Sequence, residues 1–127
     1  MTAAGNTTRP LAGRSVLVVE DQYLIADELC TMVEQLGGRV LGPAPNITSA
    51  FALLTEDRAD LALLDVNLDG EEVYPLAEAL QRVGTPLVFT TGYGHRSIDP
   101  RFADAPHLEK PIGLQVLTEV LRRLSLA

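Results

Sequence analysis

Three carboxylates, one hydroxyl and one ammonium group stand at or just after the ends of short apolar runs in this sequence. They belong to Glu20, Asp21, Asp65, Thr91 and Lys110. Transfer of a phosphoryl group requires an aligned nucleophile and neutralisation of the charge on the phosphoryl oxygens, commonly by a metal ion. A carboxylate is a suitable nucleophile, and further carboxylates can hold the metal. These five residues therefore offer the side chains that phosphoryl transfer uses.

The apolar runs that precede these residues are typical of buried strands, and they alternate with segments of helical periodicity. This alternation indicates a parallel sheet covered by helices on both faces. The carboxyl ends of such strands lie along one edge of the sheet, where ligands bind. The expected strands comprise residues 15–20, 39–42, 60–65, 86–91 and 107–109. The sequence thus predicts one α/β domain in which the five polar residues share a pocket.

Four helices are expected between and after these strands. Gly37 ends the first, Asn46 is an N-cap for the second, and Pro75 lies in the first turn of the third. Glu71 and Glu72 are expected near the positively charged end of that third helix. The last helix carries an apolar stripe formed by Leu114, Leu117, Val120, Leu121 and Leu124.

No regular helix is expected between Thr91 and Lys110. Two glycines and two prolines interrupt this segment, and its apolar residues have no clean period. We expect a loop with at most a short helical turn, which would be a degenerate fourth helix.

Bulk composition limits the classes of function. A chain of 127 residues and 13.7 kDa is expected to form one domain and to leave no room for a second one. Its net charge of -7 and its pI near 4.7 argue against nucleic acid as a direct partner. A single cysteine excludes an internal disulfide and suits a reducing, cytoplasmic compartment. Residues 1–13 read as a flexible tail, neither signal peptide nor membrane span, and the folded domain is expected over residues 14–127.

In this order, the elements resemble a bacterial response-regulator receiver domain over residues 15–127. The likeness rests on an acidic pair after the first strand, an Asp after the third, a Thr before a small residue after the fourth, and Lys-Pro after the fifth. Residues 89–93 further resemble the F-A-T-G-Y receiver subgroup, which has many single-domain members, with Thr90 in place of the usual Ala. The resemblance implies a CheY-like (flavodoxin-like) doubly wound, five-stranded parallel sheet with strand order 2-1-3-4-5.

The same resemblance implies how the acidic residues act. Asp65 would be the phosphoacceptor, taking its phosphoryl group from a sensor histidine kinase or from a small donor such as acetyl phosphate. Mg2+ is the implied cofactor, with Asp21 and Asp65 as direct ligands and Glu20 acting through water. The backbone carbonyl of Asn67 would supply another ligand.

Two further residues contact the phosphoryl group in this family. Lys110 would pair with Asp65 in the empty site and with a phosphoryl oxygen in the filled one, and the peptide bond after this lysine is usually cis. The hydroxyl is assigned to Thr91 rather than Thr90, because Thr91 precedes the small residue Gly92. The resemblance implies a stand-alone signalling domain that catalyses its own phosphorylation and dephosphorylation but is not otherwise an enzyme. Its output would be protein contact or onward transfer to a phosphotransferase, without nucleic acid or membrane as a partner.

Three other functions fit parts of the pattern. A phosphatase of the haloacid-dehalogenase type also uses an Asp nucleophile and Mg2+, but it needs a second Asp where this chain has Asn67. A flavodoxin-like cofactor binder would carry a glycine-rich phosphate loop after the first strand, and the sequence has none there. A pseudo-receiver adaptor that is never phosphorylated is a further alternative, although Asp65 and Lys110 are intact.

Simpler roles are open for several of these residues. Glu20 and Asp21 could cap the helix that follows them, and the threonines could be ordinary strand residues. His95 and His107 lack paired ligands at helical spacing, so we expect a surface or packing role for them rather than metal binding.

Two departures from the family pattern concern the readout of phosphorylation. The loop after Asp65 reaches Gly70 without the common Met-Pro segment and is shorter. His107 stands where the family often has an aromatic switch residue, and Tyr93 is a candidate substitute. Glycines and prolines follow Thr91, so we expect phosphorylation to order residues 93–106.

Overall fold

The computed structural model describes residues 9–92 and 98–124. Its main element is a five-stranded sheet with the hydrogen-bonded order β2-β1-β3-β6-β7. The strands are β1 (Ser15–Val19), β2 (Arg39–Ala44), β3 (Leu61–Asp65), β6 (Leu87–Thr91) and β7 (His107–Glu109). All neighbouring strands in this sheet are parallel. If the five strands of this sheet are numbered consecutively along the chain, their order is 2-1-3-4-5. The predicted CheY-like sheet is therefore confirmed.

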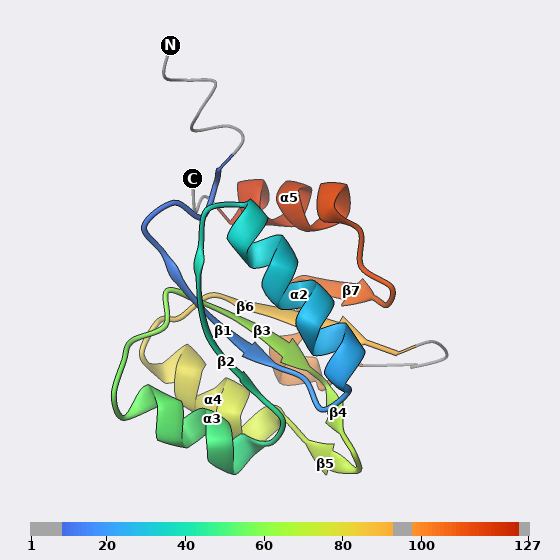
Figure 1. Ribbon diagram of the computed structural model, residues 1–127. Helices are drawn as coiled ribbons and strands as arrows, with labels where there is room; N and C mark the ends of the chain where they lie inside the picture. The colour runs from blue at the N-terminus through green and yellow to red at the C-terminus, as the bar shows by residue number, and fades with distance from the viewer. Residues whose placement is uncertain (1–8, 93–97, 125–127) are drawn as a thin grey trace.

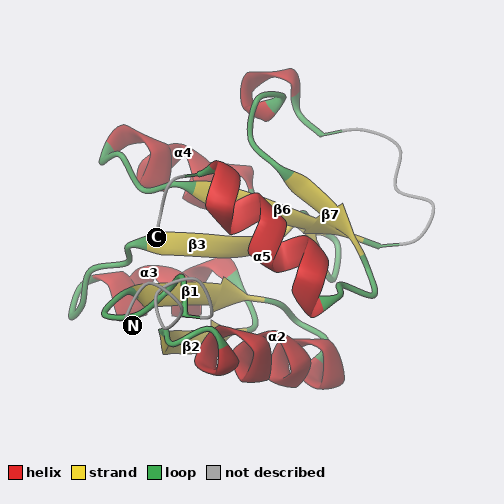
Figure 2. Ribbon diagram, turned by 90° about the horizontal axis from the view of Figure 1, so that it is seen from above, coloured by secondary structure: helices red, strands yellow, loops and turns green. Residues whose placement is uncertain are grey.

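Two pairs of helices enclose the sheet, one pair on each face (Figures 1 and 2). The helices are α2 (Tyr23–Gln35), α3 (Ile47–Leu54), α4 (Tyr74–Arg82) and α5 (Leu114–Arg123). Because successive strand residues point to opposite faces, Leu63 packs beneath α2 and α5 while Leu64 packs against α3 and α4. Burial on both faces explains why the strands are continuous apolar runs rather than alternating ones.

The helix ends follow the predicted signals. The side chain of Asn46 accepts a hydrogen bond from the Ser49 N–H at 2.8 Å and so caps α3. The helix α2 ends before Gly37, whose φ of 93° lies in the left-handed region that glycine adopts freely. Pro75 lies in the first turn of α4, where the helix loses no internal hydrogen bond. These local signals are confirmed.

A short hairpin, which the sequence did not predict, follows β3. Its strands are β4 (Asn67–Leu68) and β5 (Glu71–Glu72). Asp69 and Gly70 form the turn with φ values of 53° and 88°, the pair of positive angles that an Asp-Gly turn favours. Glu71 and Glu72 therefore lie in a strand, so their expected position at the start of α4 is wrong. The Glu71 carboxylate instead accepts the Ile47 N–H at 3.3 Å, at the N-terminus of α3.

In the described residues before β7, 98–106, the chain forms one 3-10 turn, η1 (Pro100–Phe102), and no regular helix. Phe102 is 1% exposed and stacks on Tyr74 of α4, with 5.6 Å between ring centroids. It also meets the ring of Phe89 edge-on at 5.6 Å. The Tyr74 hydroxyl accepts the Asp99 N–H at 3.0 Å. The prediction of at most a short helical turn is confirmed for the described part of this segment.

Part of the predicted N-terminal tail is packed. Residues 1–8 lie outside the described residues, but Leu11 is 1% exposed and belongs to the core beneath α2 and α5. Its N–H donates to the carbonyl of Leu36, the C-cap residue of α2, at 2.9 Å. The expected tail is therefore wrong for residues 9–13, because an apolar side chain there covers the end of a helix.

The expectations for Tyr93 and His95 concern residues outside those that the structure describes. His107 is exposed, which agrees with the first of its two expected roles, surface or packing. Within residues 9–92 and 98–124, no helix has the length and apolar character needed to cross a membrane.

Candidate functional site

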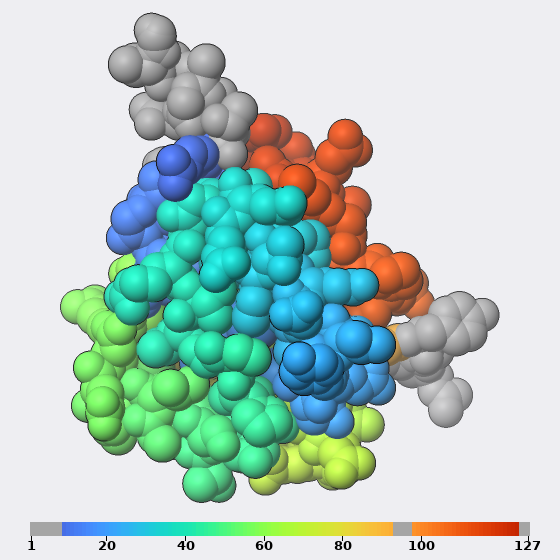
Figure 3. Space-filling model, viewed as in Figure 1, coloured from blue at the N-terminus to red at the C-terminus, as the bar shows by residue number. Residues whose placement is uncertain are grey.

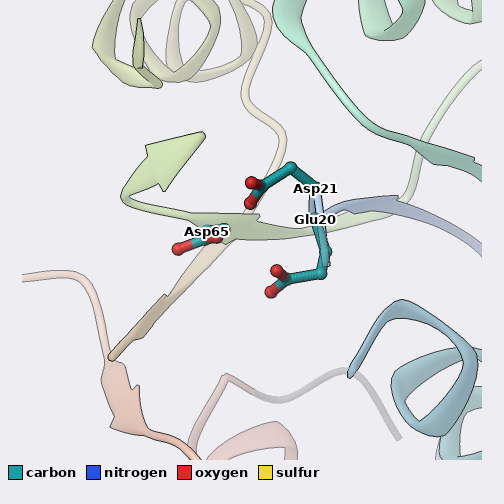
Figure 4. Close-up of side chains that lie close together, drawn as sticks. All are labelled: Glu20, Asp21 and Asp65. Carbon is teal, nitrogen blue, oxygen red and sulfur yellow. The ribbon is translucent and has the colours of Figure 1, made fainter. Parts of the chain in front are cut away.

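The three carboxylates singled out in the sequence meet at the carboxyl-terminal edge of the sheet. Glu20 and Asp21 directly follow β1, and Asp65 ends the neighbouring strand β3. One carboxylate oxygen from each of the three lies within 4.8 Å of those of the other two. Figure 4 shows the side chains turned toward a common space. Glu20 and Asp65 are buried, while Asp21 is partly exposed, so the cluster is open to solvent on one side.

Side-chain alternation along the strands explains why charged groups gather here. Glu20, Asp65 and Lys110 each lie at or just past the end of a strand. Two residues before each of them stands a member of the core beneath α2 and α5, namely Val18, Leu63 and Leu108. Because alternate strand residues share a face, the three charged side chains leave the sheet on the same face. The alternation that places the core residues on this face therefore also places the charged groups of the site there.

Lys110 supplies the positive charge at this edge. Its Nζ atom lies 2.7 Å from Glu20 Oε1 and 3.1 Å from Asp65 Oδ2. The Lys110 side chain is 12% exposed, and the side chains of Glu20 and Asp65 are 0% and 5% exposed. The expected pair with Asp65 is present, and Glu20 is a second partner that the sequence did not predict. The peptide bond after Lys110 is cis, as the resemblance implied.

The carboxylate cluster and Lys110 together carry more negative than positive charge. Burial and the neighbouring charge of Glu20 raise the pKa of Asp65 from 3.8 to about 7, although Lys110 and the Asn67 N–H act in the opposite direction. Burial acts to lower the pKa of Lys110, but its hydrogen bonds and charge interactions with Glu20 and Asp65 raise it overall. One ammonium group therefore offsets only part of the negative charge, which favours the binding of a further cation.

Thr91 and Asn67 flank the carboxylates. Thr91 ends β6, is 8% exposed, and accepts the Lys110 N–H on its backbone carbonyl at 2.8 Å. Asp65 pairs in register with Thr90, so Thr91 lies one residue farther toward the carboxyl-terminal edge. The Asn67 N–H donates to Asp65 Oδ1 at 3.3 Å, and the Asn67 side chain accepts a backbone N–H within the β4–β5 hairpin. Both predicted residues are thus brought to the site.

The donor set fits a magnesium ion. Mg2+ prefers oxygen ligands and is commonly held by one or two carboxylates together with water. The resemblance implies Asp21 and Asp65 as its direct ligands, and Glu20 lies 2.7 Å from Lys110 Nζ and accepts the Gln22 N–H at 3.0 Å. Gln22 had no signal in the sequence because it contributes only a backbone group. Its role depends on the turn that links β1 to α2.

Comparison with known proteins agrees with this arrangement. The family described as the response regulator receiver domain matches residues 16–122. Sensory transduction protein LytT of Bacillus subtilis is 31% identical over 112 residues, which cover 85% of this chain and 46% of LytT. Phyllosphere-induced regulator PhyR of Methylorubrum extorquens is 36% identical over 84 residues, which cover 64% of this chain and 32% of PhyR. The chain spans less than half the length of these two relatives.

Solved structures show the same fold. The solution structure of SdrG from Sphingomonas melonis Fr1 matches with a TM-score of 0.81 and 38% identity, covering 91% of this chain and 98% of SdrG. The family match covers the five strands of the sheet except for Ser15, and it includes Glu20, Asp21, Asp65 and Lys110. The chain therefore belongs to the response-regulator receiver domain family.

Proposed function

We propose that Asp65 accepts a phosphoryl group from a sensor histidine kinase in an Mg2+-dependent reaction, and that the phosphorylated chain signals through protein contact or onward phosphotransfer. Receiver domains are signalling domains of two-component systems and bind Mg2+ through acidic residues. One observation carries the proposal for this chain. The carboxylates of Glu20, Asp21 and Asp65 converge within 4.8 Å, and the Lys110 ammonium group lies 3.1 Å from Asp65 Oδ2.

The reaction would be a nucleophilic displacement at phosphorus. An oxygen of the Asp65 carboxylate attacks the phosphorus of a phosphohistidine, the phosphorus–nitrogen bond breaks, and its electron pair stays on the imidazole. The product is an acyl phosphate on Asp65. A bound Mg2+ supplies charge neutralisation on the phosphoryl oxygens. Only ionised Asp65 can attack, and its raised pKa of about 7 means that metal-free protein holds part of it protonated at neutral pH.

Lys110 and Thr91 would bind the transferred group. The Lys110 Nζ atom lies 3.1 Å from Asp65 Oδ2, so a small side-chain movement brings it to a phosphoryl oxygen. Glu20, 2.7 Å from the same atom, limits that movement and keeps the ammonium group at the site. Thr91 lies one residue beyond Thr90, the register partner of Asp65, and precedes the segment that leads to η1. Its hydroxyl is therefore the group through which phosphorylation would reach that segment.

A donor protein has an accessible and partly apolar approach to the site. A cleft of about 350 Å³ opens beside Lys110, lined by Ile25 of α2 and by Ile112 after β7, among others. On the same helix, Tyr23 and Leu24 are 81% and 73% exposed. In Figure 3 the blue start of α2 lies open on this face, above the yellow-green hairpin of β4 and β5. The apolar face of a phosphodonor protein would bury these side chains while presenting its histidine to the cleft.

Incubation with Mg2+ and acetyl phosphate, followed by measurement of the intact mass, tests the proposal. The wild type should gain the mass of one phosphoryl group, and chelation of the metal beforehand should prevent this. Asp65→Asn should stay unmodified. Asp104→Asn, which removes an exposed carboxylate outside the site, should be phosphorylated like the wild type.

Phosphorylated histidine kinases serve as a second class of donor in the same assay. A wild type that is unmodified by acetyl phosphate and by every kinase offered would contradict the proposal. That outcome would favour the adaptor that acts without phosphorylation.

A further inference from the structure

Thr90 carries a buried hydroxyl for which the described residues provide no hydrogen-bond partner. The residue is 1% exposed, so bulk water does not supply a partner either. An unpartnered buried hydroxyl is costly, and folded proteins contain few of them. These facts point to a partner that Thr90 meets in another state of the site.

Of the two register partners of Thr90 in the sheet, one is polar. Its register partner on β3 is Asp65, and its register partner on β7 is Leu108. Leu63, Val88 and Leu108 belong to the core beneath α2 and α5. Because alternate strand residues share a face, Thr90 and Asp65 leave the sheet on that same face, on strands about 4.8 Å apart. The Thr90 side chain thus leaves the sheet on the same face as its register partner Asp65, one strand away.

The Asp65 carboxylate can accept a further hydrogen bond. Its Oδ1 atom accepts the Asn67 N–H at 3.3 Å, and its Oδ2 atom lies 3.1 Å from Lys110 Nζ. Each carboxylate oxygen has two acceptor sites, so neither oxygen is saturated by these contacts. Rotation of the Thr90 side chain between staggered positions would redirect its hydroxyl without moving the backbone.

We propose that Thr90 acts through Asp65: its hydroxyl donates a hydrogen bond to the Asp65 carboxyl group as the acyl phosphate hydrolyses, and so shortens the lifetime of the phosphorylated state. This inference rests on the proposed function of Asp65 as the phosphoacceptor. In hydrolysis, water attacks phosphorus, the bond from phosphorus to the Asp65 oxygen breaks, and its electron pair stays on the carboxylate. The proton of the attacking water passes to solvent, and inorganic phosphate leaves. Negative charge develops on Asp65 during this step, so a donated hydrogen bond stabilises the transition state more than the acyl phosphate.

The test compares the phosphoryl half-lives of the wild type, Thr90→Val and Thr90→Ser. Each protein is phosphorylated with acetyl phosphate and Mg2+, separated from the donor, and followed by intact mass. Valine resembles threonine in shape but lacks the hydroxyl, and serine keeps the hydroxyl. We expect Thr90→Val to lengthen the half-life about three- to tenfold, which corresponds to the net contribution of one ordinary hydrogen bond. Thr90→Ser should remain within about twofold of the wild type.

Urea denaturation of the same proteins separates this role from a purely structural one. Removal of an unpartnered buried hydroxyl should leave Thr90→Val at least as stable as the wild type. A Thr90→Val half-life no longer than that of the wild type would overturn the inference and leave Asp65 as the phosphoacceptor. A Thr90→Ser protein with the half-life of Thr90→Val would overturn it as well. A wild type that acquires no phosphoryl group would overturn the proposed function, and this inference with it.

Discussion

The carboxyl-terminal edge of the sheet and the segment around η1 are held by opposite kinds of interaction. At the edge, the buried carboxylates of Glu20 and Asp65 share the single ammonium group of Lys110. Around η1, Phe102 packs against the rings of two other aromatic residues on the opposite face of the sheet. The first region depends on charge balance and responds to protons, cations and phosphoryl groups. The second depends on apolar contact and does not.

This difference shows where function and stability lie in the molecule. Burying carboxylates together costs free energy, and the same charge imbalance creates the affinity of the edge for a cation and a phosphoryl group. Aromatic packing on the other face contributes stability that offsets this cost. Substitutions in the two regions should therefore differ in their dependence on pH and on Mg2+.

Phe102→Ala should cause the largest loss of stability. Truncation of a buried aromatic side chain costs about 3–5 kcal/mol, and Phe102 is 1% exposed. Urea denaturation would measure the loss. We expect nearly the same value at about pH 5 and about pH 8, since no group with a pKa in that range takes part in the packing.

Tyr74→Phe is the matched control for this substitution. It keeps the stacked ring and removes only the hydroxyl that accepts the Asp99 N–H at 3.0 Å. The expected cost is about 1 kcal/mol. A Phe102→Ala loss no greater than that of Tyr74→Phe would mean that aromatic packing does not hold the η1 segment.

Lys110→Met should have the next largest effect, with a loss of about 3 kcal/mol at about pH 8. It leaves Glu20 and Asp65 buried without their cation, so the loss should shrink as the pH falls and the carboxylates bind protons. Urea denaturation as a function of pH measures this. The control is Arg39→Met, which breaks the exposed pair between Arg39 and Asp57 and should change stability much less. If the stability lost in Lys110→Met were independent of pH, the Lys110 ammonium group would not be stabilising the buried carboxylates by its charge.

Asp65→Asn should stabilise the metal-free protein at higher pH. The pKa of Asp65 is about 7 in the folded protein against an ordinary value of 3.8, so between these values the folded state binds more protons than the unfolded chain. The free energy of unfolding therefore falls as the pH rises from about 4 to about 7. At about pH 8, Asp65→Asn should be more stable than the wild type by about 1–3 kcal/mol. The neutral amide avoids the free-energy cost of ionising a buried carboxyl group, and loss of the ion pair with Lys110 offsets part of this gain.

The pH dependence of urea denaturation checks this last effect. The difference between the wild type and Asp65→Asn should vanish near pH 4, where Asp65 is protonated in the folded protein. A constant difference across the range would mean that the Asp65 carboxyl group titrates normally.

The parts of the fold with strong local signals were predictable from the sequence. Continuous apolar runs indicated strands buried on both faces, and Asn46 and Gly37 marked helix ends through their side-chain and backbone properties. The site residues Glu20, Asp21 and Asp65 were predictable because each stands at the end of such a run. Parallel strands then bring them to one edge whatever their separation along the chain.

Two kinds of feature were not predictable: very short strands, and contacts between residues that lie far apart in the sequence. The strands β4 and β5 are two residues each, too short to show a period. The packing of Leu11 rests on one apolar residue in a polar stretch. The pair between Lys110 and Glu20 depends on how far each side chain reaches across β3 and β6, the two strands between them, which the order of motifs does not determine.

Reductive trapping of the phosphorylated protein tests the central claim most directly, because borohydride converts a phosphorylated aspartate into homoserine that peptide mass spectrometry can locate. After incubation with Mg2+ and acetyl phosphate, we predict homoserine at position 65 alone. None should form without Mg2+ or in Asp65→Asn. Homoserine at another aspartate with Asp65 unchanged, or no homoserine at any position, would contradict the assignment of Asp65 as the phosphoacceptor.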